Sequence, residues 1–250
     1  MNRLVPLLLI LGACKNDYTF PGGEDPFVSA DPGDVGTWLS LDVAPDGTRM
    51  TMAYYDRSQG ALMYAIGTPI LAPLGSAPAS TEGDASWIWS YEKVDGWAGS
   101  NGLDPGDRGL YASQRTAPDG TVWIAYADAN GGLWTAHRTG GPVWVLEAAD
   151  PVGGAWASLA LDAEGQPVIA HQDETKGTLR VTRQVDGGWQ SEEAYVGQLF
   201  SGTDAEGNAV LRPAGAGKFA DLHISDGMER VAFYDTAQQE LVLIGGEAGG

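Results

Sequence analysis

From residue 34 onward, short runs of alternating apolar and polar residues are separated by turns rich in glycine and acidic residues. One such pattern recurs four times, and each copy begins with a glycine and a short apolar run. It then passes an acidic–glycine turn, continues into a second run that ends in aspartate, and turns into a third run headed by leucine. The copies are Gly36–Ala65, Gly109–Ala136, Gly154–Thr182 and Gly217–Ile244. Alternation with period two between turns is typical of strands, so the repeat predicts an all-β fold.

The acidic–glycine turns predict a tight hairpin in every copy. They are Asp46–Gly47, Asp119–Gly120, Glu164–Gly165 and Asp226–Gly227. An Asp-Gly pair between alternating apolar runs favours a type I′ turn, in which both central residues take a positive φ. We therefore expect two-residue hairpin turns at these four places.

The second and third runs keep a nearly constant register after the turn. The second run ends in Asp56, Asp128, Asp173 and Asp235, and an alanine stands three positions before each: Ala53, Ala125, Ala170 and Ala232. A ring stands two positions before each aspartate: Tyr54, Tyr126, His171 and Phe233. The third run begins at Leu62, Leu133, Leu179 and Leu241. We expect the alanine to let neighbouring sheets approach closely near a common axis.

A fourth run follows in the first three copies. There a tryptophan precedes a glutamate by three positions, in Trp89 and Glu92, Trp144 and Glu147, and Trp189 and Glu192. The complete unit is then four antiparallel strands in about 45 residues, which is typical of a β-propeller blade. We expect the glutamates to be solvated charges on outer strands, where charge discourages edge pairing.

The repeat resembles those of bacterial sialidase-like propellers with BNR-like repeats. The copy that carries the resemblance best is SLALDAEGQPVIAHQD, residues 158–173, and the likeness extends over residues 34–244. It implies a propeller of four-stranded blades. The sialidase Asp-box, Ser-x-Asp-x-Gly-x-Thr-Trp, is approached only by residues 119–123, so the resemblance does not imply sialidase activity.

The blade count follows from length. The 217 residues from Asp34 to Gly250 allow four or five blades of about 45 residues each. Residues 204–211 echo the hairpin of the repeat, but they lie too close to Gly227 for a whole blade and are best interpreted as an inserted hairpin. The fourth copy has no tryptophan run, and either residues 18–28 or further chain could supply its fourth strand.

The amino-terminal residues predict where in the cell the protein is located. A positive charge at Arg3 precedes an apolar run, Leu4–Ala13, which is too short to span a bilayer as a helix. Leu11–Cys14 resembles the bacterial lipobox, with the only cysteine of the chain at the position that receives the lipid. We therefore expect a signal peptide at 1–13, a lipid on Cys14, a tether at 14–33 and a propeller at 34–250.

The alternative is an ordinary signal peptide followed by a stray thiol. Under the lipoprotein interpretation the membrane is a partner through Cys14. Lys15 stands where an aspartate would resemble the inner-membrane retention signal. The resemblance therefore implies an outer-membrane lipoprotein of the cell envelope.

Composition narrows the classes of partner. The chain has 33 acidic and 14 basic residues and a net charge of −19, which disfavours nucleic acid because phosphates need a basic surface. A single cysteine cannot form a disulfide within the chain. With 43% hydrophobic residues there is enough apolar material for a packed core.

The strand-ending aspartates mark the candidate site. Asp56, Asp128, Asp173 and Asp235 are expected on the same face as the long connections 93–108 and 194–216, and long loops on a rigid scaffold often carry binding. Trp97, Asn101 and Asp104 of the first connection complete the predicted ligand-binding face. A ring of aspartates could hold Ca²⁺. The repetition favours the alternative that each aspartate caps its own turn, so no cofactor is assigned.

Candidates for catalysis are few. The histidines His137, His171 and His223 fall at different repeat positions, and the arginines do not recur in register. No nucleophile elbow or phosphate loop is present, so no catalytic residue is assigned. We expect a non-catalytic binding or scaffold module for a protein or glycan partner. The alternative is a glycoside hydrolase or lyase of the sialidase-like propeller type, with its site on the long-loop face.

Overall fold

The computed structural model describes residues 35–44, 48–69, 87–96 and 106–247, all within the compact unit formed by residues 34–250. These residues form seventeen strands and no helix. Accordingly, the described part of the chain has no helix long and apolar enough to cross a bilayer. Cys14 and the predicted tether lie outside the described residues.

Fifteen of the seventeen strands form four sheets in which neighbouring strands follow chain order. Blade 1 consists of β1 (Val35–Val43), β2 (Met50–Asp56), β3 (Ala61–Pro69) and β4 (Trp87–Gly96). Blade 2 consists of β5 (Arg108–Thr116), β6 (Val122–Asp128), β7 (Leu133–Arg138) and β8 (Val145–Asp150). Blade 3 consists of β9 (Ala155–Leu161), β10 (Pro167–Asp173), β11 (Thr178–Val185) and β12 (Gly188–Val196). Blade 4 consists of β15 (Lys218–Ser225), β16 (Met228–Asp235) and β17 (Glu240–Glu247). The remaining pair, β13 (Phe200–Thr203) and β14 (Ala209–Arg212), forms a sheet of its own.

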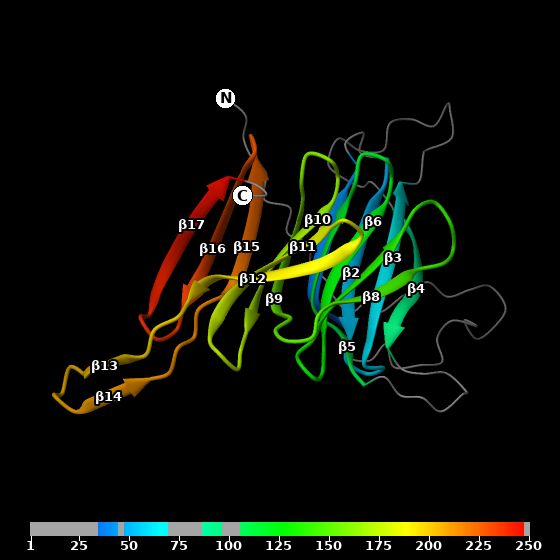
Figure 1. Cartoon of the computed structure of the whole chain (residues 1–250). Helices are drawn as coiled ribbons and strands as arrows, with labels where there is room; N and C mark the ends of the chain where they lie inside the picture. The colour runs from blue at the N-terminus through cyan, green and yellow to red at the C-terminus, as the bar shows by residue number, and fades with distance from the viewer. Residues whose placement is uncertain (1–34, 45–47, 70–86, 97–105, 248–250) are drawn as a thin grey trace, which may run out of the picture. The chain divides into compact units, whose positions relative to one another are not determined.

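The predicted fold class is confirmed. Each of the first three repeats is a four-stranded antiparallel meander, and these sheets are arranged as the blades of a β-propeller (Figure 1). Among the described residues the fourth repeat has three strands. The segment that echoes the repeat is not a fifth blade but the hairpin β13–β14, which projects away from the blades in Figure 1.

The turn prediction is wrong at two places and correct at one, and the fourth predicted turn, Asp46–Gly47, lies outside the described residues. Asp226 and Gly227 both have positive φ, 53° and 70°, as a type I′ turn requires. At Gly120 and Gly165 only the glycine has a positive φ, and the preceding acid does not. These loops are one residue longer than predicted, because the Gly120 amide bonds to the Ala117 carbonyl and the Ala117 amide bonds to the Thr121 carbonyl. That is a type I turn followed by a left-handed glycine.

Apolar side chains fill the spaces between the blades. The strand nearest the axis in each blade packs against the matching strand of the next, in the order β1, β5, β9, β15. Three core clusters lie between blades 1 and 2, 2 and 3, and 3 and 4. The recurring Ala53, Ala125 and Ala170 are fully buried in these spaces, as the small side chain predicted.

A serine in the innermost strand joins each blade to the next. The amide of Gln114 donates to the Ser40 hydroxyl at 3.0 Å, that of Leu159 to Ser113 at 3.0 Å, and that of Leu222 to Ser158 at 2.9 Å. All three serines occupy the same repeat position. A bond between innermost strands at one matched position therefore fixes the blades at a constant stagger.

Candidate functional site

The four strand-ending aspartates are buried, and each is held by its own turn. Asp128 is the fullest example: its carboxylate accepts the amides of Asn130 and Gly132 and the indole N–H of Trp134 at 2.8–3.0 Å. Asp56 likewise accepts from Gln59, Asp173 from Thr175 and Lys176, and Asp235 from Ala237 and Gln238. The capping alternative thus describes these carboxylates, whose oxygens point into separate turns.

A calcium ring is not assembled by these residues. Among the described residues, no three histidine, cysteine, aspartate or glutamate side chains are grouped closely enough to hold a metal ion. Trp97, Asn101 and Asp104 lie outside the described residues. Their predicted role in a ligand-binding face stays a prediction.

The turns that contain the aspartates lie beside the connections between blades. The Arg108 amide donates to the Gly60 carbonyl at 3.1 Å, and the Ala216 amide donates to the Gly177 carbonyl at 3.1 Å. Each bond joins the start of one blade to the turn that follows the second strand of the blade before it. We name this side of the blades the Asp-turn face, and the side with the acidic–glycine hairpins the hairpin face.

A row of aromatic rings crosses the innermost strands near the Asp-turn face. Trp38, Tyr111, Trp156 and Phe219 contribute one ring from each blade. Ring centroids are 4.7 Å apart from Trp38 to Tyr111, 4.9 Å from Tyr111 to Trp156 and 4.2 Å from Trp156 to Phe219. The interplanar angles of 45–54° describe tilted contacts, which aromatic quadrupoles favour over face-to-face stacking. We call these four residues the aromatic row.

The backbone of the aromatic row is strained. All four residues have φ between 50° and 56°, the left-handed region that costs an L-residue roughly 1–2 kcal/mol. Each lies where the pairing of its innermost strand with the second strand is irregular. Strain of this kind concentrates at functional sites, and here it repeats once per blade and points four rings toward one another.

A hollow on the Asp-turn face lies between blades 2 and 3. It has a volume of about 270 Å³ and is lined by the turns around Asn130, Val152 and Glu174, and it reaches Ala155, the residue before Trp156. Burial, with a contribution from the charge of Glu174, raises the pKa of Tyr111. Glu174 lines this hollow, and the Tyr111 hydroxyl is neutral at physiological pH.

Larger hollows lie on the hairpin face, one between each pair of neighbouring blades. Their volumes are about 420 Å³ between blades 1 and 2, 400 Å³ between blades 2 and 3 and 470 Å³ between blades 3 and 4. Their linings share hairpin residues and differ in chemistry from one pair to the next. A hollow that recurs in every gap follows from the widening space between blades, and these hollows contain no strained aromatic residue.

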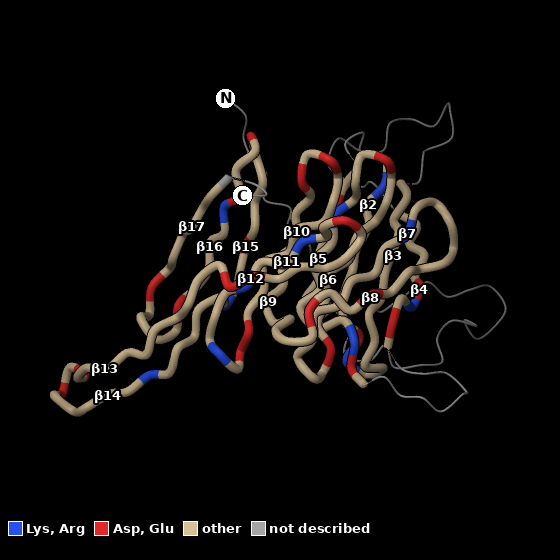
Figure 2. The backbone as a smooth tube through the Cα atoms, in the orientation of Figure 1, with Lys and Arg blue, Asp and Glu red and all other residues tan. Residues whose placement is uncertain are grey.

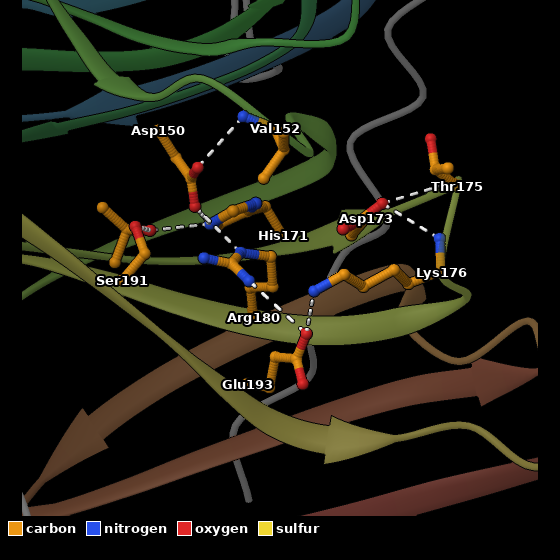
Figure 3. A network of polar contacts seen from close by, with 10 residues as sticks. Asp150, Val152, His171, Asp173, Thr175, Lys176, Arg180, Ser191 and Glu193 are labelled. Atoms are coloured by element: carbon orange, nitrogen blue, oxygen red, sulfur yellow. Dashed lines mark hydrogen bonds and ion pairs between the residues drawn. The ribbon is translucent and has the colours of Figure 1, made fainter.

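A buried polar network joins blades 2 and 3. The Asp150 carboxylate, at the end of β8, accepts the Arg180 guanidinium Nε–H at 2.8 Å and lies 3.8 Å from His171 Nε2. Figure 3 shows these three side chains pointing toward one another. Burial is the main cause that lowers the pKa of His171 from 6.5 to about 4, so this imidazole is neutral at physiological pH.

The network resembles a nucleophile–base–acid array but lacks its geometry. His171 Nε2 is 2.7 Å from the Thr182 hydroxyl, and Thr182 is in turn 2.6 Å from the Ser191 hydroxyl. Thr182 and His171 are fully buried. Because buried Thr182 separates Ser191 from His171, this network pairs no solvent-facing nucleophile with a base, and its contacts join blades 2 and 3.

The same position makes an equivalent contact across each gap between blades. The fourth-strand residue opposite the third-strand leucine reaches the ring residue of the next blade. In the first gap Asp95 accepts the Tyr126 hydroxyl at 2.6 Å, and in the second Asp150 approaches His171. In the third gap the fourth-strand residue is Tyr195, whose ring packs 5.1 Å from Phe233. The fourth-strand residue is thus an aspartate where the ring of the next blade is polar, and an aromatic residue where that ring is apolar.

The fourth-strand glutamates make contacts that the prediction of solvated outer-strand charges does not include. Glu92 forms an ion pair with Arg138 of the next blade at 2.7 Å, and Glu147 accepts the indole N–H of Trp189 in the next blade at 3.1 Å. Glu192 pairs at 2.8 Å with Arg183, whose other nitrogen reaches Glu229 of blade 4 at 2.9 Å. These acids are not simply solvated edge charges, because they or their partners connect blades.

Sequence reasoning missed the aromatic row, although its signal is present. An aromatic residue stands two positions after the first glycine of every repeat, in the pairs Gly36 and Trp38, Gly109 and Tyr111, Gly154 and Trp156, and Gly217 and Phe219. The spacing marks a repeated position. The left-handed φ that brings the rings together is visible only in the structure.

Comparisons with known proteins find no matching protein-family model and no matching curated protein. Solved structures to which the chain is similar include a Trypanosoma rangeli sialidase, with 10% identity, a TM-score of 0.43, and coverage of 86% of this chain and 45% of that one. A GH43_1 enzyme from Xanthomonas citri has 10% identity and a TM-score of 0.42, with coverage of 87% and 75%. The Aleuria aurantia lectin has 16% identity and a TM-score of 0.45, with coverage of 85% and 61%.

The chain thus spans less than half the length of the sialidase that it matches. At identities of 10–16% and these TM-scores, no activity or ligand passes to this chain. The blade architecture is established by the strand pairing and by the packing between blades described above.

Proposed function

We propose that the protein is a non-catalytic, glycan-binding propeller of the cell envelope. The observation that carries the proposal is the aromatic row, in which four strained residues at one repeat position hold their rings in contact near the axis. Aromatic side chains supply large apolar area with little conformational freedom to lose. The apolar C–H face of a sugar ring is a natural partner for such a surface.

The surroundings of the row support a ligand with hydroxyl groups. The hollow of about 270 Å³ reaches Ala155, the residue before Trp156, and is lined largely by turns, whose backbone groups can exchange hydrogen bonds with sugar hydroxyls. Ligand sites commonly combine an apolar surface with a few convergent polar groups. Exposed Glu174 and Asn130 are the side chains best placed to supply them.

Charge favours neutral over acidic glycans. Figure 2 shows acidic residues at turns between strands as well as along them, and the chain carries a net charge of −19. A carboxylated or sulfated sugar would meet repulsion across this surface, and the repulsion weakens as salt increases. We therefore propose a neutral oligosaccharide as the ligand.

The enzyme alternative is less well supported. The strand-ending aspartates are buried in their turns, and Asp95 and Asp150 are engaged between blades. Among the described residues, the exposed acids near the Asp-turn face include Asp107 and Glu174. A glycosidase needs two carboxyl groups flanking one bond, and these two residues are therefore the ones to test.

The test is a titration of the purified protein with neutral oligosaccharides, using wild type, Trp156→Ala and Val143→Ala. Val143 is 73% exposed and precedes β8, so its truncation is a control that leaves the row intact. Binding should weaken at least tenfold in Trp156→Ala and stay unchanged in Val143→Ala. Equal binding in all three proteins would refute the site, and a far-UV spectrum of each variant checks that it is folded.

The same samples decide between binding and catalysis. Each is incubated with chromogenic glycosides and with polysaccharides, and released sugar is measured. We expect no turnover. Turnover that disappears in Asp107→Asn or Glu174→Gln would contradict the non-catalytic proposal and support the hydrolase or lyase alternative.

The location is a separate part of the proposal and rests on the amino-terminal sequence. Lipid chains at Cys14 would hold the protein on the outer membrane, since two or three acyl chains give stable anchoring. Cys14→Ala should release the protein from the membrane fraction. Continued retention of that variant would contradict lipid anchoring and would leave the glycan test unaffected.

A further inference from the structure

The three blade–blade interfaces are built from the same positions. Every blade has a tail side, which faces the following blade, and a head side, which faces the preceding one. On the tail side lie the alanine of the second strand, the leucine that heads the third strand and the serine acceptor. On the head side lie the residue whose amide binds that serine and its apolar neighbours. The two ends of the row of blades each present one of these sides.

The head side of blade 1 is uncovered. Leu41 occupies the position of Gln114, Leu159 and Leu222, which are 0%, 0% and 2% exposed, yet Leu41 itself is 39% exposed. Its neighbours Leu39 and Val43 are 40% and 50% exposed. The Leu41 position, which is buried against a preceding blade in the other three blades, thus faces outward in blade 1 together with two apolar neighbours.

The tail side of blade 4 is uncovered in the same way. Leu241 is 76% exposed, whereas the leucines that match it, Leu62, Leu133 and Leu179, are all 0% exposed. Leu243, two positions later, is 69% exposed. Asp221 occupies the position of the three acceptor serines, and its side chain is exposed at the end of the row.

The two ends do not cover each other within the chain. Packing between innermost strands runs from β1 to β5, β9 and β15, and among the described strands no comparable packing joins β15 back to β1. The aromatic row follows the same course. Phe219 at its end is 63% exposed, and the ring contacts of the described residues do not include one between Phe219 and Trp38.

We propose that the tail side of blade 4 binds the head side of blade 1 in a second copy of this chain. The occupant is argued from continuity, because the second copy offers the head side that every other tail side in the molecule binds. The Asp221 carboxylate would accept the Leu41 amide of the second copy, as Ser158 accepts the Leu222 amide. Leu241 and Leu243 would pack against its Leu39, Leu41 and Val43.

Such head-to-tail contacts form closed rings when the rotation permits. Two copies of a four-blade row give eight blades, which is within the range of known propellers. The strong negative charge of each copy opposes association. Because salt screens repulsion between exposed charges, the dimer should tighten as ionic strength rises.

The first test is disulfide cross-linking in a Cys14→Ala background, which leaves the chain without cysteine. Full chains that carry Asp221→Cys are mixed with differently tagged chains that carry Leu41→Cys, and the mixture is oxidised. We expect a disulfide between the two tags. The matched control replaces Leu41→Cys by Ile88→Cys, since Ile88 is 61% exposed on β4, away from the head side.

Two outcomes would overturn the proposal. One is cross-linking by Leu41→Cys no stronger than by Ile88→Cys. The other is a disulfide that forms only within single chains when Asp221→Cys and Leu41→Cys are combined in one protein, which would show that the row closes on itself.

The second test is sedimentation of the Cys14→Ala protein over a range of concentrations. We expect a dimer that dissociates at least tenfold more readily in Leu243→Glu and is unaffected by Ile88→Glu. Asp221→Ser restores the residue of the other three blades and should associate at least as tightly as the parent. A monomer at all concentrations and salt levels, or a dimer that Leu243→Glu leaves intact, would contradict the proposed interface.

Discussion

Replacing His171 by phenylalanine should remove a pH-dependent part of the stability. Blade 4 carries Phe233 in the matched position, so a phenyl ring fits the slot that the repeat provides. His171 is fully buried, and its pKa is lowered from 6.5 to about 4, mainly by burial. Because the folded protein resists protonation, the unfolded chain takes up the proton first as the pH falls. The contribution of His171 to stability is therefore complete above pH 6.5 and is lost between pH 6.5 and pH 4.

The size of the effect follows from these two pKa values. Between pH 7 and pH 5 the neutral, buried imidazole accounts for a loss of about 2 kcal/mol in the free energy of unfolding. The assay is urea unfolding of wild type and His171→Phe at both pH values. The variant should lose about 2 kcal/mol less than wild type, whatever its stability at pH 7. His223→Phe, at an exposed histidine, is the control and should lose as much as wild type.

An equal loss in wild type and His171→Phe would refute this reasoning. It would mean that the imidazole is charged in the folded protein or reaches solvent. In that case the Asp150 carboxylate, 3.8 Å away, would be holding a second cation beside Arg180, and the interface between blades 2 and 3 would be an ionic cluster.

Two further predictions concern the contacts between blades. Asp150→Ala should lower the free energy of unfolding by about 3–5 kcal/mol, because it leaves the largely buried Arg180 without its closest carboxylate. Glu193→Ala, at a more exposed ion pair, should lower it by less than about 1 kcal/mol. Urea unfolding measures both effects. Ser158→Ala should cost roughly 1–3 kcal/mol and speed hydrogen exchange at the Leu222 amide, which loses its buried acceptor.

The blade itself could be predicted from sequence because its signals are local. Alternation, the aspartate that ends the second strand and the leucine that opens the third all lie within one repeat, and each acts on neighbours in the chain. The capping role of Asp128 is of this kind, since its backbone partners are only two and four residues away. Such local signals can be interpreted from the sequence without knowledge of the tertiary structure.

Contacts between blades could not be predicted in the same way. Asp95 and Tyr126 are 31 residues apart, and Glu147 and Trp189 are 42 apart, so no local rule relates them. Glu147 therefore resembles a solvated edge charge until the next blade is in place. The prediction of the hairpin turn at Gly120 is wrong for a local reason, because one additional residue before this glycine converts a two-residue turn into a longer loop.

The candidate site could be predicted only in part, because its turns are local features and its ring contacts join different blades. The position of the long connections predicts the Asp-turn face, but the aspartates on it are turn caps, and the sequence pattern does not single out the rings beside them. Those rings become a candidate site only because Trp38, Tyr111, Trp156 and Phe219 all adopt a left-handed φ. Propensity rules treat such a conformation as exceptional for bulky residues, so sequence alone would not assign it.

The measurement that tests the account most directly is an experimental structure of the protein with a neutral oligosaccharide bound. The account predicts a sugar ring in contact with Trp156 of the aromatic row and hydroxyl groups directed toward the hollow at Asn130 and Glu174. A sugar bound only on the hairpin face, or no bound sugar at concentrations that saturate binding in solution, would contradict it.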